Sequence, residues 1–164
     1  KNSVNKQHNY LTLNRGELDN IKPGMGVVTS NGVIGVVRGV SDHFSTAMSL
    51  LNTELRVSSK LKESEFFGPL SWTGSDYRYA HLREIPLHAD VEKGDTVVTS
   101  GYSSIFPEGI SVGYVEDYEE KGGRFYEMKV QLSVDFKRVS DVYIIRNLRK
   151  KERKKLENQA NYND

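Results

Sequence analysis

The residues that could carry chemistry in this chain are few, and their spacing matches no common catalytic or metal-binding motif. The chain contains four histidines and no cysteine, which excludes a thiolate metal site and a cysteine nucleophile. No two histidines lie four positions apart with a glutamate between them, so the helical zinc motif of metalloproteases is absent. His88 near Asp90 comes closest to a metal pair, but a polar surface segment before a turn is the preferred interpretation of this spacing.

A serine hydrolase is the main enzymatic alternative. Gly74-Ser75-Asp76 lacks the sequence context of a serine nucleophile, and His43 follows Asp42 in a turn-like segment. A catalytic triad depends on geometry rather than on sequence order, so a hydrolase acting on cell-wall or peptide substrates is kept as an alternative. The glycines are spaced as turn residues, not as a phosphate-binding loop. The sequence therefore predicts no catalytic residue, no metal site and no cofactor, and we expect the purified protein to lack hydrolytic activity.

The stretch from Gly94 to Val115 carries the clearest structural signal in the sequence. Residues 95–99 are β-branched and apolar, and residues 110–115 alternate with period two, so both are predicted strands. The loop between them is closed by turn residues that fix its backbone. The residues to which we assign a structural role in this motif are Gly94, Asp95, Thr99, Ser100, Gly101, Pro107, Gly109 and Gly113.

The loop of this motif carries large apolar residues where polar ones are usual. Tyr102, Ile105 and Phe106 are therefore the candidate partner-binding residues. Phe106 has two possible roles, as a plug that closes the second β unit or as an anchor for a partner. Pro107 and Gly109 fix the backbone beside it, which favours the plug, with Ile105 facing outward.

A shorter version of the same motif occurs earlier in the chain. Val27–Ser30 recurs as Val97–Ser100, 70 positions later, and each copy follows a lysine and a glycine. Each copy is also followed by a glycine and a second β-rich run. This pattern predicts two related β units.

The remaining sequence indicates an all-β fold of two small barrel or sandwich domains in tandem. Asn31-Gly32 between valine-rich runs and Gly122-Gly123 between alternating runs both predict hairpins. Residues 45–51 fit either a helical turn or a buried strand, and the strand is preferred. Residues 141–145 form the last predicted strand, and the sequence does not decide which domain this strand joins.

These elements suggest a division of the chain into segments. Residues 1–20 are expected to form the end of a coiled-coil linker and a first strand. Residues 21–66 are expected to form the first β domain and residues 67–145 the second. Pairing of the last strand of the chain with the first domain is left open. We expect separate cores, with the boundary in the polar segment near residues 62–70.

The charge is unevenly distributed along the chain. Residues 146–155 contain seven basic residues and one acidic residue, whereas residues 1–145 contain 16 basic and 19 acidic residues. Such a body is not a nucleic-acid footprint. Residues 146–164 are predicted to be a basic tail, either a frayed helix or, preferably, disordered, and dispensable for folding. A functional alternative is contact with an acidic partner, lipid head groups or the wall polymer.

Two further observations limit the function. No apolar run approaches the roughly 20 residues that span a bilayer, and no signal peptide is visible. A carbohydrate-binding module that uses Trp72, Tyr77 and Tyr79 is a third alternative, which an exposed, coplanar pair of these rings would favour and a buried Trp72 would oppose.

Three stretches of the chain, taken together, resemble a known family. They read Gly94-Asp95-x-Val97-x-Thr99-Ser100-Gly101 with Phe106-Pro107-x-Gly109-Ile110-x-Val112-Gly113-x-Val115; Asn14-x-Gly16 with Gly24-Met25-x-Val27-x-Thr29-x-x-Gly32-Val33-Ile34-Gly35-x-Val37; and Val134-Asp135-Phe136-x-Arg138-Val139-x-x-Val142. This combination resembles the bacterial rod shape-determining protein MreC, over residues 10–145.

The resemblance implies a scaffold rather than an enzyme. Members of the family are anchored to the inner membrane by one helix, followed by a coiled coil and two β domains that face the periplasm. Their expected partners are the class B penicillin-binding transpeptidase of elongation, MreD, and further copies of themselves in dimers or filaments. The present sequence resembles the β region alone, so we expect membrane attachment only through a helix outside it. The barrels also resemble the halves of trypsin-like proteases, but no catalytic residue is carried over to this chain.

Overall fold

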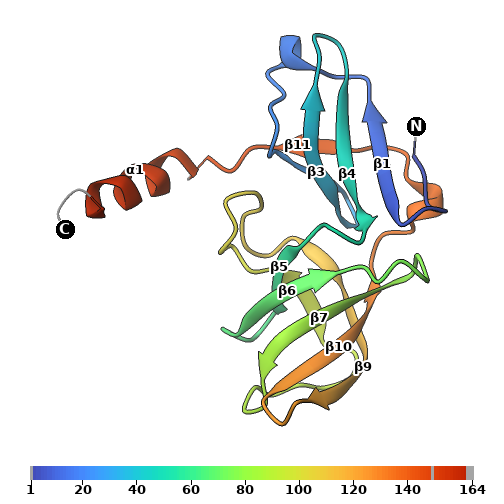
Figure 1. The fold of residues 1–164 in the computed structure, drawn as a ribbon, viewed down its shortest axis with the longest axis vertical. Coiled ribbons are helices and arrows are strands. Elements are labelled where there is room, and N and C mark those ends of the chain that lie inside the picture. Colours follow the sequence, from blue (N-terminus) through green and yellow to red (C-terminus); the bar gives the residue numbers. More distant parts are fainter. Residues whose placement is uncertain (1, 149, 162–164) are drawn as a thin grey trace.

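The computed structural model describes residues 2–148 and 150–161 of the 164-residue chain. Two β units lie one above the other, and a helix projects to one side of them (Figure 1). Short 3-10 turns, η1 (Glu17–Asp19) and η2 (Phe136–Arg138), occur at the connections. The predicted all-β class with two small β domains and a charged C-terminal tail is confirmed.

The first unit is an open five-stranded antiparallel sheet in the order β1-β4-β3-β2-β11. Its strands are β1 (His8–Leu13), β2 (Gly26–Thr29), β3 (Gly32–Val40), β4 (Ser45–Asn52) and β11 (Tyr143–Ile145). The Asn31-Gly32 hairpin joins β2 to β3 as predicted, with Thr29 opposite Gly32. The last strand, β11, returns to this sheet and pairs with β2, which decides between the alternatives that the sequence left open.

The second unit is a closed six-stranded barrel in the order β10-β7-β6-β5-β8-β9. Its strands are β5 (Val57–Leu61), β6 (Phe67–Ser71), β7 (Tyr79–Pro86), β8 (Thr96–Thr99), β9 (Ser111–Lys121) and β10 (Phe125–Leu132). Gly122 and Gly123, both with positive φ, form the predicted hairpin between β9 and β10. Closure leaves the barrel without a free sheet edge.

The division between the units lies earlier in the chain than the sequence indicated. Strand β5 falls inside the segment 21–66 assigned to the first domain, but it pairs with β6 and β8 of the barrel. Its side chains explain this position, because Val57, Ser59 and Leu61 alternate as buried residues that face the barrel interior. The first strand expected within residues 1–20 is present as β1, and it pairs with β4 of the first sheet.

The sequence repeat corresponds to a repeat in hydrogen bonding. The Gly24 amide donates to the Val37 carbonyl at 2.7 Å, and the Gly94 amide donates to the Val115 carbonyl at 2.8 Å. Both glycines have a left-handed backbone, with φ of +88° and +89°. A turn with a lysine and this glycine thus begins each copy of the repeat and leads into the same type of strand.

The second strands of the two repeats also match. Gly35 lies opposite Val27 and Gly113 lies opposite Val97, and in each unit a β-bulge follows immediately. A Cβ on either glycine would collide with a carbonyl oxygen of the next strand, that of Met48 or of Gln131. Glycine at these positions therefore allows a close approach of neighbouring strands. The main difference is the connection, which is two residues long in the first unit and is replaced by the loop 100–110 in the second.

The two units share one continuous hydrophobic core among the described residues, contrary to the expected separate cores. The Asn31-Gly32 turn of the first sheet lies directly against the barrel. The Ser133 hydroxyl donates to the Asn31 carbonyl at 2.6 Å, and a Cβ on Gly32 would meet Ser133 Oγ at 2.7 Å and collide with the Ser111 carbonyl. The hairpin between β2 and β3 therefore also joins the first unit to the second.

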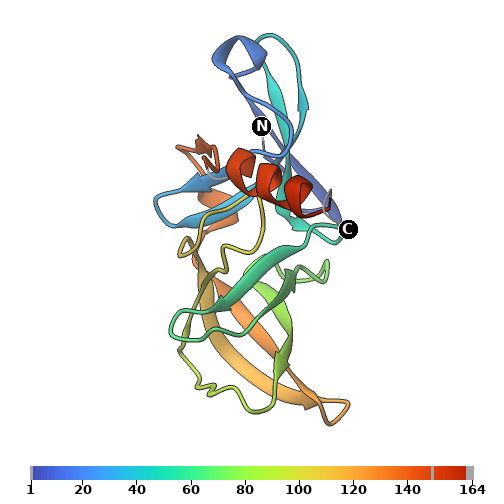
Figure 2. The same ribbon diagram turned by 90° about the vertical axis from the view of Figure 1, so that its left-hand side faces the viewer.

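The basic tail forms a helix, α1 (Lys150–Ala160), where the sequence favoured disorder. Its residues are strong helix formers, and Arg153 pairs with Glu157 one turn later at 2.9 Å. Residues 151–161 are exposed. Figure 2 shows α1 in front of the junction between the two units. Within the described part of the chain, no helix is long and apolar enough to cross a membrane.

Candidate partner-binding surface

Thr99, at the end of β8, closes the loop 100–110 with a single side chain. Its hydroxyl donates to the Pro107 carbonyl at 2.6 Å and accepts from the Ile110 amide at 2.9 Å. The Thr99 side chain is buried, so neither loop group could turn to water instead. The threonine of the motif therefore holds the C-terminal end of the loop against the barrel.

Other motif residues shape the backbone of the loop and of the turn before β8. Gly101 and Gly109 have positive φ, +79° and +94°, and a Cβ on Gly101 would lie 2.9 Å from the Glu108 Cβ. Ser100 Oγ lies 2.7 Å from Ser58 Oγ and accepts from the Tyr102 amide at 3.2 Å. On the preceding turn, the Asp95 carboxylate accepts from the Glu92 amide at 2.8 Å. All these contacts fix backbone geometry.

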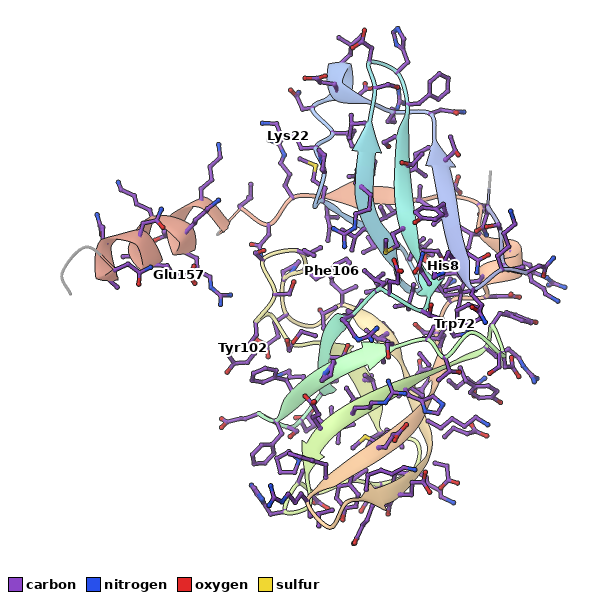
Figure 3. All side chains as sticks on the ribbon, viewed as in Figure 1. His8, Lys22, Trp72, Tyr102, Phe106 and Glu157 are labelled. Atoms are coloured by element: carbon purple, nitrogen blue, oxygen red, sulfur yellow. The ribbon has the colours of Figure 1, made fainter. Side chains whose placement is uncertain are left out.

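Phe106 is buried and links the loop to the first sheet. Its side chain is 2% exposed, so it offers no surface to a partner in this structure, and it drops out of the candidate partner-binding set. Its ring lies on Gly26 of β2, where a Cβ would lie 2.5 Å from Phe106 Cε1 and 3.2 Å from Ile145 Cγ1. Figure 3 shows Phe106 between the loop and the first sheet. Ile105 is half-buried and packs against the same core.

Tyr102 is the exposed member of the predicted set, and it does not stand alone. Its ring stacks on Phe67 of β6, with centroids 4.1 Å apart and an interplanar angle of 18°. Tyr102 is 56% exposed and Phe67 is 44% exposed. Sequence reasoning missed Phe67, although alternation at the start of a strand places one residue of the Phe66-Phe67 pair outward. We call Tyr102 and Phe67 the aromatic stack.

Helix α1 forms a cleft with the loop beside this stack. Arg153 Nη1 donates to the Tyr102 carbonyl at 3.0 Å, and the cleft has a volume of about 1130 Å³. Figure 3 shows Tyr102 and Glu157 on the same side of the molecule. The cleft is lined by Lys60, Glu65, Ser100, Gly101, Tyr102, Ser104, Pro107, Glu108, Asn147, Glu152, Arg153, Leu156 and Glu157. A surface of this kind, with mixed charges around an aromatic side chain, suits a protein partner.

The polar clusters on the barrel do not form the serine–histidine pair that a hydrolase would need. His81 Nδ1 lies 3.0 Å from Glu127 Oε1, and this hydrogen bond, with Arg83 nearby, holds the pKa of Glu127 below its ordinary value. The nearest serine in the sheet, Ser71, is buried and accepts from Arg83 Nη1 at 2.7 Å. No side-chain hydrogen bond among the described residues joins Ser71 to His81. The serine oxygen is thus occupied by a guanidinium rather than by a base.

Two of the residues singled out from the sequence for catalysis or metal binding, Asp76 and His88, have other partners in the structure. Hydrogen bonds from Arg78 lower the pKa of Asp76 to about 2, so this carboxylate is already paired. His88 packs edge-on against Phe66, with centroids 4.8 Å apart. Within residues 2–148 and 150–161, no group of three or more acidic or histidine side chains could hold a metal ion.

The carbohydrate-binding alternative fails on the positions of its three rings. Trp72 is buried, and its indole donates to the Asp76 carbonyl at 2.8 Å. The Tyr79 ring carries the Lys129 ammonium 4.2 Å from its centroid, and the Tyr77 ring carries that of Lys137 at 4.5 Å. These rings make cation–π contacts inside the protein and leave no exposed coplanar pair for a sugar.

The chain was compared with known proteins. The family model for the rod shape-determining protein MreC, barrel core, matches residues 1–146. The cell shape-determining protein MreC of Listeria monocytogenes is 33% identical over 115 residues, which cover 68% of this chain and 39% of the relative. The Bacillus subtilis protein of the same name is 31% identical over 121 residues, covering 66% and 41%. The chain therefore spans about two-fifths of the length of these relatives.

Solved structures give the same picture of the fold. An MreC from Listeria monocytogenes superposes with a TM-score of 0.79 at 28% identity, covering 87% of this chain and 69% of the other. MreC from Pseudomonas aeruginosa gives 0.77 at 22% identity, covering 87% and 91%. The MreC of a complex between penicillin-binding protein PBP2 and MreC from Helicobacter pylori gives 0.69 at 20% identity, covering 87% and 88%. The last two likenesses concern the fold alone.

Proposed function

Because this chain belongs to the family of the rod shape-determining protein MreC, we propose that it is a non-enzymatic scaffold of the bacterial cell-wall elongation machinery. In this role it maintains rod shape by holding peptidoglycan synthesis proteins together. Its place is the periplasmic face of the inner membrane, with attachment through a segment outside the present sequence. The class B penicillin-binding transpeptidase of elongation is its main partner, and the aromatic stack is the surface that binds it.

The observation that carries this proposal is the exposed aromatic stack on a loop whose backbone is fixed. Tyr102 and Phe67 present two large rings to solvent. Thr99 and Phe106 hold the loop at one end and against the first sheet. Exposed aromatic side chains on rigid backbones are typical centres of binding energy in protein interfaces, because little conformational entropy is lost when they bind.

Two related proteins support the choice of partners. The Helicobacter pylori relative was solved as a complex with the penicillin-binding protein PBP2. Another relative with this fold is described as a cell shape-determining filament. By analogy we propose that this chain binds a penicillin-binding transpeptidase and also associates with further copies of itself. Contact with MreD is proposed on the family resemblance alone.

A non-enzymatic role is supported by the hydrogen bonds that already engage the polar side chains of the barrel. Ser71 lies opposite His81, which is paired with Glu127, but Ser71 is buried and accepts a hydrogen bond from Arg83. Each carboxylate in these clusters is already engaged by a histidine or an arginine. We therefore expect no turnover of peptide or peptidoglycan by the purified protein. Steady hydrolysis that is lost on replacing Ser71 or His81 would contradict this.

The binding proposal is tested with the periplasmic part of the class B transpeptidase from the same bacterium. Tyr102→Ala removes half of the aromatic stack, and we expect the dissociation constant to rise about tenfold or more, as for a central aromatic interface residue. The matched control is Tyr114→Ala, since Tyr114 is 47% exposed on β9, outside the cleft. Circular dichroism checks that both variants fold. Equal affinity of the parent and the Tyr102→Ala protein would place the binding surface elsewhere.

A further inference from the structure

The charges in the cleft beside Tyr102 do not balance. Lys60 is paired with Glu108, and Arg153 is paired with Glu157. Both basic side chains of the cleft are therefore already neutralised by carboxylates of the same cleft. Their attraction to any further anion is correspondingly weak.

Two further acidic residues of the cleft lack such a partner. Glu65 lies in the connection between β5 and β6, two residues before β6 begins, and Glu152 lies in the first turn of α1. Neither forms an ion pair within the part of the chain that the structure describes. The cleft therefore has an excess of negative charge, although the tail that forms one of its walls is strongly basic. The basic side chains Lys151 and Lys155 lie around a separate hollow of α1. Lys154 lines that hollow and also a smaller one next to Tyr102 and Glu157, and counting it still leaves the carboxylates of the cleft in excess.

Apolar groups lie next to these carboxylates. Tyr102 lines the cleft and stacks on Phe67, and Pro107 of the same loop also lines the cleft. From the opposite wall, Leu156 contributes an aliphatic side chain that is 61% exposed. The cleft thus combines exposed apolar surface with uncompensated carboxylates.

The size of the cleft favours a polypeptide over a small molecule. Its volume of about 1130 Å³ exceeds the range of about 300–1,000 Å³ in which most small-molecule pockets fall. Its walls come from a loop and a helix that are joined by a described hydrogen bond from Arg153 to the Tyr102 carbonyl. Such a groove can accept an extended segment along its length.

We propose that the cleft between the loop 100–110 and α1 receives an extended, basic segment of the partner protein. An apolar side chain of this segment packs against Tyr102 and Leu156. Lysine or arginine side chains of the segment pair with Glu65 and Glu152. The inference rests on the proposed function, because it names the chemistry by which the transpeptidase is recognised at this surface.

The test reverses the two unpaired charges. The variant Glu65→Lys/Glu152→Lys is compared with the control Glu116→Lys/Glu120→Lys, which reverses two exposed carboxylates of β9 outside the cleft. Binding of the periplasmic part of the transpeptidase is measured by calorimetry at ionic strengths of about 0.1 M and about 1 M, where the Debye length is about 10 Å and about 3 Å. At the lower ionic strength we expect the cleft variant to bind about tenfold more weakly than the parent and the control. At the higher ionic strength this difference should largely disappear.

The outcomes separate this inference from the proposed function. If Tyr102→Ala weakens binding but the cleft variant binds like the parent, the transpeptidase uses the stack without a basic segment, and the inference is overturned while the proposed function stands. Equal weakening of the cleft variant and the control would reduce the effect to overall charge and would also overturn it.

Two further measurements cover the remaining cases. If the transpeptidase does not bind the parent at all, a synthetic peptide of alternating lysine and leucine serves as the probe. Shifts of the Gly101 and Tyr102 amide resonances that the cleft variant lacks would then support the inference, and their absence would reject it. Finally, sedimentation of the parent alone detects a second copy whose lysine face fills the cleft. If the parent forms a dimer and the cleft variant does not, the occupant of the cleft is a second copy of this chain, and the proposed partner segment is overturned.

Discussion

At the scale of single residues, the loop 100–110 depends on one buried hydroxyl. Thr99 was identified from the sequence as a motif residue, but its role could not be read there. Its two side-chain partners, Pro107 and Ile110, lie eight and 11 residues away. Contacts of this kind are set by the path of the loop rather than by local propensity. The equivalent residue of the first repeat, Thr29, only accepts from the nearby Asn31 amide at 3.1 Å.

This difference between the repeats gives a matched pair of substitutions. Thr99→Val keeps the shape of the side chain but leaves the Pro107 carbonyl and the Ile110 amide without their partner, so we expect a loss of about 2–4 kcal/mol in the free energy of unfolding. Thr29→Val should cost less than about 1 kcal/mol, because the group it leaves is exposed. Urea unfolding of both variants measures this. Similar losses for the two would mean that the Thr99 hydrogen bonds do not hold the loop.

Phe106 and Gly26 form the second residue-scale feature. The sequence predicted a buried Phe106, because Pro107 and Gly109 restrict the loop backbone, but it pointed to the barrel as the site of burial. The structure adds a neighbour that lies 80 positions away in the first sheet, Gly26. Only the docking of the two units brings this glycine and this ring together, so no local pattern could reveal the pair.

We expect the two positions to be energetically coupled. Phe106→Ala should cost about 3–5 kcal/mol, the usual range for a buried phenylalanine. Gly26→Ala alone should also destabilise, since the new Cβ would lie 2.5 Å from the Phe106 ring. In the Phe106→Ala background this added cost should fall, giving a coupling of about 1–2 kcal/mol in a double-mutant cycle of unfolding free energies. Simple additivity would show that the ring does not rest on Gly26 in solution.

At the scale of elements, hairpins and strands were largely predictable, whereas their partners were not. Asn31-Gly32 and Gly122-Gly123 are local turn signals, and both form hairpins. The assignment of β5 to the barrel and of β11 to the first sheet depends on pairings across long sequence separations. Helix α1 was underestimated because a charged segment without an apolar stripe resembles a disordered one.

The tail gives the prediction that belongs to this scale. Residues 151–161 are exposed, so α1 buries little apolar surface. Removal of residues 146–164 should therefore change the melting temperature by less than about 2 °C. Truncation after Val142 removes β11 as well and should lower it by about 4 °C or more, because β11 completes the first sheet. A large drop on removing 146–164 alone, measured by calorimetry, would mean that α1 is part of the folded core.

At the scale of the whole molecule, three features join the two β units. Strand β11 follows the barrel in sequence but pairs with β2, Phe106 of the barrel loop lies on Gly26, and the Asn31-Gly32 turn rests on Ser133. The repeat in the sequence suggested two independent cores. Duplication of a β unit explains the similar strands, but the contacts between the units are not repeated, so the sequence repeat could not indicate them.

These connections predict that the two units unfold as one. Calorimetry should give a single transition with equal calorimetric and van't Hoff enthalpies.

Gly32→Ala tests the contact between the two units. It should weaken this contact strongly, because Gly32 has φ of +145° and its Cβ would collide with the Ser111 carbonyl of the barrel. Gly122→Ala is the control, since Gly122 also has positive φ, +62°, but nothing lies within 4 Å of its Cβ position. The control should lower stability by about 1–2 kcal/mol from backbone strain alone and keep one transition. The Gly32→Ala protein should lose more stability and broaden or split the transition. Two separate transitions in the parent, or equal effects of the two substitutions, would show that the units fold independently.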